Sequence, residues 1–214
     1  MTDITIIGTG NMARGIGTRA VAAGRSLEIL GRDSAAAQAL AAELGSAVGF
    51  GSSADVAPAG ALVVLALPFD AAKEVVAGYG DKLAGKVLID ITNPVDFTTF
   101  DSLVVAPGTS AAEEIAALAA PGAVVVKAFN TAFAGTLVTG SVAEETLDIF
   151  IAGDDAEAKS AVSSFVSDAG LRPIDVGPLR RSRELEGFQF VIMTLQANPE
   201  FDTFNWNTGL KVLV

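Results

Sequence analysis

Short apolar runs recur along the chain, separated by stretches in which apolar residues follow a helical period. Most of these runs are apolar at every position, which is typical of parallel strands covered on both faces. Strands are therefore predicted at Asp3–Ile7, Leu27–Leu30, Ala47–Phe50, Ala61–Leu67, Lys86–Asp90, Ala123–Phe129, Leu147–Ala152 and Arg172–Asp175.

Helical segments alternate with these strands. Ser110 and Glu113 have the spacing of a capping box at the start of one of them, and Phe188, Ile192 and Leu195 share one side of the last. The predicted helices are Asn11–Ala23, Ser34–Leu44, Ala71–Gly78, Thr109–Ala119, Asp155–Ala169 and Arg181–Ala197. This alternation predicts an α/β fold with a doubly wound, mostly parallel sheet.

The first strand breaks into a glycine-rich turn, ITIIGTGNMARG from Ile4 to Gly15. Gly8 permits a tight turn, Gly10 lets the backbone approach a pyrophosphate, and Ala13 is small enough for close packing of helix against strand. The positive end of the following helix would face the phosphates. The pattern indicates a dinucleotide site; the alternative is a turn of purely structural use.

The end of the second strand bears on the choice of dinucleotide. An NAD site usually has a carboxylate there, but from Ile29 to Ser34 the chain reads ILGRDS, with Arg32 following the strand. A guanidinium can bind a 2′-phosphate through two hydrogen bonds, and Ser34 can add a hydroxyl or cap the next helix. We therefore predict NADP(H), with Asp33 as the residue that favours NAD.

Composition narrows the chemistry further. The chain has 214 residues, a formal net charge of −11, no cysteine and no histidine. Thiol and histidine acid/base mechanisms are therefore excluded, and neither a metal site nor an essential catalytic side chain is expected. A reaction that needs orientation more than proton transfer, such as hydride transfer between two redox cofactors, fits these absences.

The charge also argues against nucleic-acid and anionic-membrane partners. There is no long apolar run and no apparent signal region before the first strand, so we expect a cytoplasmic protein. The end of the chain, Phe201–Val214, is unusually apolar and is expected to be buried in the core or across a homodimer interface.

Three loops follow central strands and should line the ligand crevice of an α/β sheet. They read LPF at 67–69, TNP at 92–94 and FNTAF at 129–133. Their amides and hydroxyls can orient a carboxamide or a flat ring. The alternative is that Pro and Asn serve only as turn residues and the phenylalanines only as core.

Several segments together resemble the coenzyme F420:NADP oxidoreductases, a family of small reductases of the deazaflavin coenzyme. The segments are GTGNM at 8–12, GR at 31–32, LP at 67–68, GDD at 153–155, and GLRPIDVGPL at 170–179 followed by Ser182, Arg183 and Glu186. The resemblance covers most of the chain. It implies a Rossmann-like domain, 1–140, and a smaller C-terminal lobe, 141–214, that closes the cofactor cleft.

The resemblance also implies hydride transfer between NADP(H) and the deazaflavin, with Thr9 to Met12 and Arg32 on the phosphates, and Pro68 and Ala132 near the nicotinamide. Together with the loop residues, the expected cofactor-binding set is Gly8, Thr9, Gly10, Asn11, Met12, Gly31, Arg32, Ser34, Leu67, Pro68, Asn93, Asn130 and Ala132.

The chain departs from the family at Asn130, where archaeal members that use the deazaflavin have a histidine. The segment 126–131, VKAFNT, also resembles the reductase domain of eukaryotic membrane metalloreductases, which pass hydride to a flavin. FMN, FAD, ferric iron or a small substrate therefore stay open as acceptors. Two further alternatives are a non-catalytic NADP(H) sensor and a dehydrogenase that uses Lys127.

Overall fold

The computed structural model describes residues 2–201, 203–204 and 206–213. Its centre is an eight-stranded sheet in the order β10-β9-β6-β5-β4-β1-β2-β3. The strands are β1 Ile4–Ile7, β2 Leu27–Gly31, β3 Gly49–Ser52, β4 Leu62–Leu65, β5 Val87–Asp90, β6 Val124–Lys127, β9 Asp148–Gly153 and β10 Arg172–Gly177. A separate two-stranded hairpin joins β7 Ser141–Val142 to β8 Glu145–Thr146.

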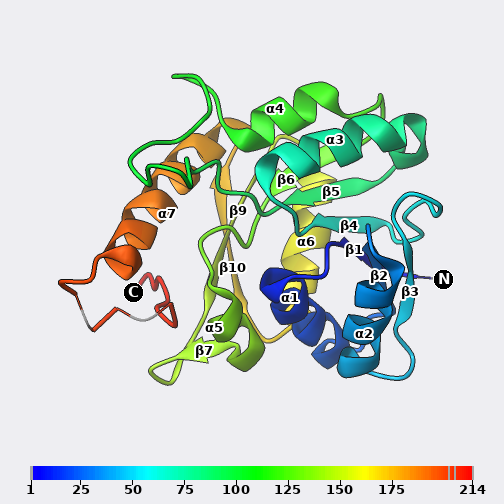
Figure 1. The fold of residues 1–214 in the computed structure, drawn as a ribbon, viewed down its shortest axis with the longest axis horizontal. Coiled ribbons are helices and arrows are strands. Elements are labelled where there is room, and N and C mark those ends of the chain that lie inside the picture. The colour runs from blue at the N-terminus through cyan, green and yellow to red at the C-terminus, as the bar shows by residue number, and fades with distance from the viewer. Residues whose placement is uncertain (1, 202, 205, 214) are drawn as a thin grey trace.

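Helices cover both faces of this sheet (Figure 1). The helices are α1 Asn11–Ala22, α2 Ser34–Leu44, α3 Phe69–Tyr79, α4 Ala111–Leu118, α5 Ala134–Thr139, α6 Ala156–Asp168 and α7 Ser182–Ala197, with short 3-10 turns at Gly80–Leu83 and Leu179–Arg181. One apolar core joins the sheet to α1, α2, α5 and α6, and a second joins it to α3 and α4.

The predicted fold class is confirmed, because the sheet is mostly parallel and is wound in both directions from β1. One pairing differs from the expectation: β9 runs antiparallel to β6. The strands β9 and β10 extend the same sheet although they fall within the expected C-terminal lobe. The division at residue 140 stays a prediction.

The sequence did not indicate α5, a short helix with weak local signals. It forms against α1, where a Cβ added at Gly15 would lie only 2.9 Å from the Cβ of Leu137. Close packing against a neighbouring helix therefore stabilises a segment whose own helix propensity is low.

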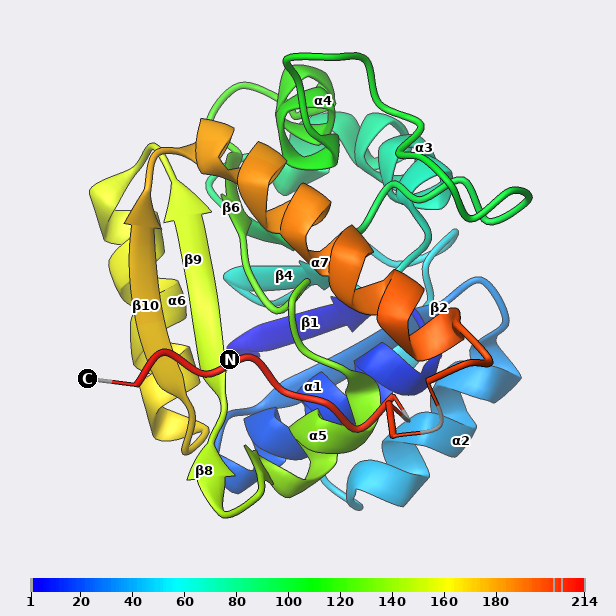
Figure 2. The same ribbon diagram turned by 90° about the vertical axis from the view of Figure 1, so that its left-hand side faces the viewer.

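Helix α7 buries a polar side and exposes an apolar one. Glu186 and Gln189 are buried, whereas Phe188 is 51% exposed and Val191 is 53% exposed. The side that carries Phe188 therefore does not face the core. In Figure 2 the helix crosses in front of the central strands, and Met193 meets the loops that follow β4 and β5.

The C-terminal segment returns along the same side of the molecule (Figure 2). The Trp206 ring packs edge-on against Phe133, with ring centroids 5.7 Å apart, yet Trp206, Phe201 and Leu213 are exposed. Burial of these three residues in the core, one of the two expectations, is therefore wrong, and a dimer interface stays a prediction. Val214 lies outside the described residues.

Among the described residues, no helix combines the length and the apolar character needed to span a bilayer.

Candidate functional site

The winding of the sheet changes direction between β1 and β4, which lie side by side. Open α/β sheets bind ligands at the carboxyl ends of the strands at such a point. A pocket of about 330 Å³ is found there. Its lining residues are Gly10, Asn11, Met12, Ala66, Leu67, Pro68, Phe69, Ile91, Thr92, Asn93, Phe97 and Met193.

The two glycines of the turn after β1 have different reasons to be glycine. Gly8 has a φ of +127°, and a Cβ there would lie 2.1 Å from the carbonyl oxygen of Ala66, so the fold itself excludes a side chain. Gly10 has a φ of −83°, and a Cβ there would meet nothing within 4 Å. Protein packing leaves the space in front of Gly10 open, on the wall of the pocket.

The N-terminus of α1 is open to an anion. Its first turn contains no acidic residue, and no side chain of the described residues caps its amide groups. The Asn11 side chain turns to one side, where Arg14 donates to its Oδ1 at 2.9 Å and also pairs with Glu43. Unpaired amides and the helix dipole together suit a diphosphate, so the turn fits a dinucleotide.

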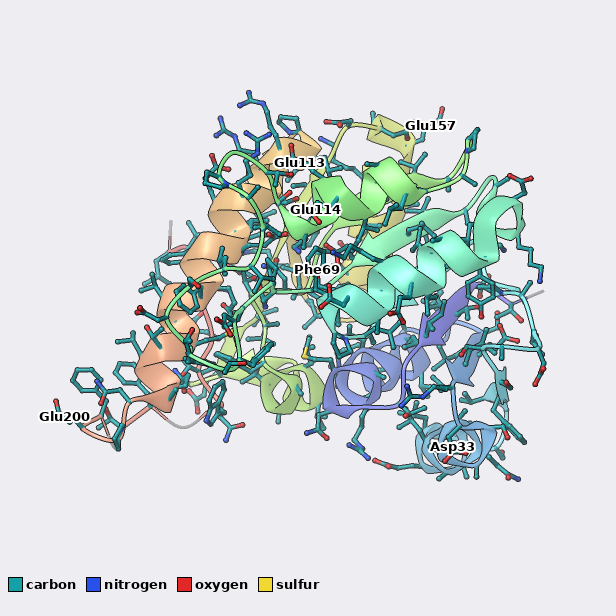
Figure 3. All side chains as sticks on the ribbon, turned by 45° about the horizontal axis from the view of Figure 1, so that its top comes forward. Asp33, Phe69, Glu113, Glu114, Glu157 and Glu200 are labelled. Atoms are coloured by element: carbon teal, nitrogen blue, oxygen red, sulfur yellow. The ribbon has the colours of Figure 1, made fainter. Side chains whose placement is uncertain are left out.

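The two charged residues after β2 have separate environments. The Asp33 carboxylate caps α2 by accepting from the backbone N–H of Ala35 at 2.9 Å, and Figure 3 shows Asp33 at this helix start. Ser34 is the first helical residue and not the cap. The exposed Arg32 guanidinium has no hydrogen bond or ion pair within the described part of the chain.

Gly31 brings this corner close to the glycine turn. A Cβ at Gly31 would lie 2.8 Å from the Thr9 side chain and 2.9 Å from the Asp33 carbonyl oxygen. The close approach therefore holds Arg32 near the glycine turn. Thr9, Gly31, Arg32 and Ser34 lie outside the pocket lining, on the β2 side of the turn.

Two asparagine side chains join the loops after β5 and β6. Asn93 donates from Nδ2 to the backbone oxygen of Asn130 at 2.9 Å, and Asn130 donates from Nδ2 to Asn93 Oδ1 at 3.0 Å. Phe129 has a left-handed φ of 63° and is fully buried against Phe165. A non-glycine residue in this conformation marks a turn that the surrounding packing imposes.

Asn93 lines the pocket, whereas Asn130 and Ala132 are buried behind it. Within the described part of the chain, Thr92 Oγ1, Asn130 Oδ1 and Thr131 Oγ1 near these loops, and Ser182 Oγ and Gln189 Oε1 on α7, are buried without a hydrogen-bond partner. Buried polar atoms usually find a partner in protein, water or ligand. The inner wall of the site therefore retains hydrogen-bonding capacity.

Lys127 lies at the end of β6 but does not reach the pocket. Its Nζ contacts Asp90 at 2.8 Å, Glu186 at 2.7 Å and the Thr92 carbonyl oxygen at 2.5 Å, and the side chain is 0% exposed. Burial raises the pKa of Glu186, while the neighbouring Lys127 opposes the increase. All three of the lysine's donors are engaged, which argues against its use as a catalytic acid.

Glu186 also fixes α7 to α4. Its carboxylate accepts from the backbone N–H groups of Ala111 and Ala112 at 2.9 and 3.3 Å. Ser110 caps α4 as its spacing predicted, because its Oγ accepts from the N–H of Glu113, but the Glu113 carboxylate accepts from the Ser110 hydroxyl and not from its backbone N–H, so only half of the capping box is formed. Glu113, labelled in Figure 3, lies at the junction where α4 meets α7 and Arg183. These contacts hold α7 across the end of the sheet.

Six of the residues expected to bind the cofactor line this pocket: Gly10, Asn11, Met12, Leu67, Pro68 and Asn93. Phe97 and Met193 also line the pocket, although neither was among the expected cofactor-binding residues. Met193 is brought in by α7, far along the chain, and no local pattern indicated its position. Phe97 follows the selected TNP loop, and an aromatic residue beside a strand-end loop was the available signal.

Asp154 and Asp155, the acidic pair of the GDD segment, serve structural roles. Asp155 caps α6 by accepting from the N–H of Ala158 at 2.8 Å, and Asp154 accepts from the N–H of Leu179 at 2.9 Å. Both carboxylates are thus engaged with backbone amides, as helix-start residues commonly are.

The family model described as NADP oxidoreductase coenzyme F420-dependent matches residues 3–94. This segment contains the glycine turn, Arg32 and the loops that follow β4 and β5. The family resemblance inferred from the sequence is therefore confirmed.

Named relatives include two kinds of reductase. Metalloreductase STEAP3 of Rattus norvegicus is 32% identical over 86% of this chain, and the match covers 35% of STEAP3. The F420-dependent NADP reductase of Methanothermobacter marburgensis is 28% identical, with 96% of this chain and 95% of the relative covered. A crystal structure of a proposed F420 dependent NADP-reductase from Arthrobacter sp. FB24 matches with a TM-score of 0.83 and 29% identity, covering 99% of this chain and all of that one.

Proposed function

We propose that this chain, a relative of the coenzyme F420-dependent NADP oxidoreductases, transfers a hydride between NADP(H) and a planar redox acceptor. One observation carries the proposal. The pocket beside the glycine turn has no charged side chain among its described lining residues. A neutral, largely apolar pocket suits a flat ring and gives no counter-charge to the carboxylate of a small acid substrate.

The dinucleotide would lie across the carboxyl ends of β2, β1 and β4. The open N-terminus of α1, with Gly10 and Asn11, would bind the diphosphate, and Arg32 would bind the 2′-phosphate of NADP. Asp33 is occupied as a helix cap, whereas Arg32 has no ionic partner among the described residues, which supports NADP over NAD.

The nicotinamide ring would lie near Pro68 and Asn93, between the loops after β4 and β5. When bound, NADPH supplies the hydride. The protein would contribute orientation and exclusion of water, because a near-attack geometry can by itself lower the barrier substantially. Thr92 and Asn93 offer polar atoms beside the ring, and the Asn93–Asn130 pair fixes their loop.

For the acceptor we propose a deazaflavin of the F420 type. Support comes from the extent of the match, since the F420-dependent NADP reductase of Methanothermobacter marburgensis aligns along 95% of its own length, whereas the match covers 35% of STEAP3. A flavin is the second candidate. It is favoured by Asn130 and by the VKAFNT segment around Lys127.

Anaerobic mixing of the protein and NADPH with F420, FMN or FAD in separate cuvettes tests the proposal through the visible absorbance of each acceptor. Bleaching of F420 alone is the expected result. Bleaching of a flavin alone would show that the acceptor is a flavin and not the deazaflavin. Tight NADPH binding without any bleaching would favour a sensor.

We also propose that the protein acts in the cytoplasm as a homodimer through the outer side of α7. An apolar stripe with Phe188 and Val191 on a helix is usually covered by a partner. Changing Phe188 to Glu should convert a dimer into a monomer in sedimentation-velocity runs, with Arg180→Glu as the exposed control. A monomeric wild type at micromolar concentration would contradict the dimer.

A further inference from the structure

Phe97 combines two features that rarely occur together. Its side chain is 68% exposed, yet it lines the pocket beside the glycine turn. Single exposed apolar side chains are common on protein surfaces, but this ring also lines a pocket, where a bound ligand would cover it.

The loop that carries Phe97 is firmly built. Asp96 accepts hydrogen bonds from the Thr98 N–H and the Thr99 hydroxyl, both at 2.9 Å, and its own N–H donates to the Ser102 carbonyl oxygen at 2.9 Å. A bridge between Val95 and Leu103 closes the loop at its base. These hydrogen bonds therefore fix the backbone of the loop that carries Phe97.

Two further rings connect this loop to α7. The Phe97 and Phe100 centroids are 6.1 Å apart, and Phe100 lies 6.2 Å from Phe190, which is on α7. These separations lie in the range of favourable aromatic pairs. Phe100 has a φ of 54°, a conformation that turns the chain after the loop tip. The row of rings fixes the loop relative to Met193, which lines the same pocket.

Phe97 and Met193 come from elements outside the β1–α1–β2 unit that holds a dinucleotide. The pocket wall formed by Gly10, Leu67 and Pro68 faces the expected position of the nicotinamide. The wall formed by Phe97 and Met193 belongs to the loop after β5 and to α7. A second ring placed against the nicotinamide would therefore meet this outer wall.

We infer that Phe97 is an aromatic platform that, together with Met193, holds the tricyclic ring of the acceptor against the nicotinamide. The inference rests on the proposed function. Stacking on an aromatic face and sulfur contact with a ring edge both suit a flat heteroaromatic ring. The unpartnered hydroxyl of Thr92, a lining residue that is 3% exposed, offers a hydrogen bond to the polar edge of that ring.

The test compares Phe97→Ala with Phe97→Tyr in the full-length protein. Val104→Ala is the matched control, because Val104 is exposed on the same loop and does not line the pocket. Steady-state kinetics with F420 and, separately, FMN give kcat and the acceptor KM, and NADPH fluorescence gives the cofactor Kd. Loss of one aromatic stack should raise the acceptor KM about tenfold.

The expected pattern is a raised acceptor KM in Phe97→Ala, a nearly wild-type value in Phe97→Tyr and Val104→Ala, and an unchanged NADPH Kd in all three. The affected acceptor distinguishes deazaflavin from flavin. Equal weakening of NADPH and acceptor, or no change in the acceptor KM, overturns the platform while leaving the proposed function intact. A wild-type protein that reduces neither acceptor overturns the proposed function and the platform with it.

Discussion

Asn93 and Asn130 bind each other through two hydrogen bonds, one to a backbone carbonyl and one between side-chain amides. The pair joins loops that are far apart in sequence, and places a rigid edge beside the pocket. Asn130 is almost fully buried, so its amide acts through Asn93 and not by contact with the pocket.

Replacing Asn130 with Ala should lower the free energy of unfolding by about 1–3 kcal/mol, because Asn93 Oδ1 loses its donor, while the bond from Asn93 Nδ2 to the backbone oxygen of residue 130 remains. We expect kcat to fall more than the NADPH Kd rises, since the change loosens the loop that carries Thr92 and Asn93. Chemical denaturation gives the free energy of unfolding. Single-turnover rates at a series of NADPH concentrations give the catalytic rate and the NADPH Kd. Unchanged kcat in a destabilised variant would limit the pair to a structural role.

The two glycines of the turn should respond differently to alanine. In Gly8→Ala the new Cβ would meet the Ala66 carbonyl oxygen, so the free energy of unfolding should fall by at least about 2 kcal/mol.

The free energy of unfolding of Gly10→Ala should stay within about 1 kcal/mol of the wild-type value. Its Cβ would nevertheless occupy the diphosphate position, so NADPH binding should weaken at least tenfold, roughly the effect of about 1.4 kcal/mol. Calorimetric titration with normal affinity in Gly10→Ala would place the diphosphate elsewhere.

Arg32→Ala should raise the KM for NADPH by about 10- to 100-fold, because a charge-assisted bidentate contact to the 2′-phosphate is lost. The KM for NADH should change little. Arg180→Ala is the matched control, because Arg180 is also exposed and has no ion pair among the described residues. Equal losses for both dinucleotides would remove Arg32 from the 2′-phosphate site.

Lys127→Met should destabilise the protein by about 3–5 kcal/mol, since two buried carboxylates lose their shared cation. Combining it with Glu186→Gln should restore part of the loss, which urea unfolding can measure. Because Lys127 also holds the Thr92 carbonyl oxygen, the folded variants should lose no more of the wild-type kcat than Asn130→Ala does. A correctly folded variant without turnover would instead support lysine catalysis and the dehydrogenase alternative.

The ion pair between Glu113 and Arg183 predicts a pH effect. The Arg183 hydrogen bond lowers the pKa of Glu113 below its ordinary value of 4.5, although partial burial opposes this. Because the folded state favours the ionised form, the stabilisation is present above pH 4.5 and is lost as the pH falls through the folded pKa. Glu113→Gln should therefore cost about 0.5–1 kcal/mol at pH 7, with the difference shrinking in acid. If the free energies of unfolding of wild type and Glu113→Gln differ by the same amount from about pH 3 to about pH 7, this linkage is excluded.

The sequence determined the features whose signals are local. Apolar runs gave the strands of the sheet, because buried parallel strands need apolar side chains on both faces. The glycine turn was readable because its conformation depends on residues adjacent in the chain. Gly8 in particular has a φ of +127°, a local conformation that favours glycine.

Tertiary structure decided the features that depend on distant segments. The periodicity of α7 showed an apolar stripe but not which side faces inward; its buried side is polar because it packs on Lys127 and the polar strand ends. Phe97 and Met193 line one pocket only because α7 crosses the loop after β5. Asp33 was ambiguous as sequence, and its hydrogen bond to Ala35 settled its structural use. Pairings of this kind follow from packing in three dimensions, which residue spacing along the chain does not encode.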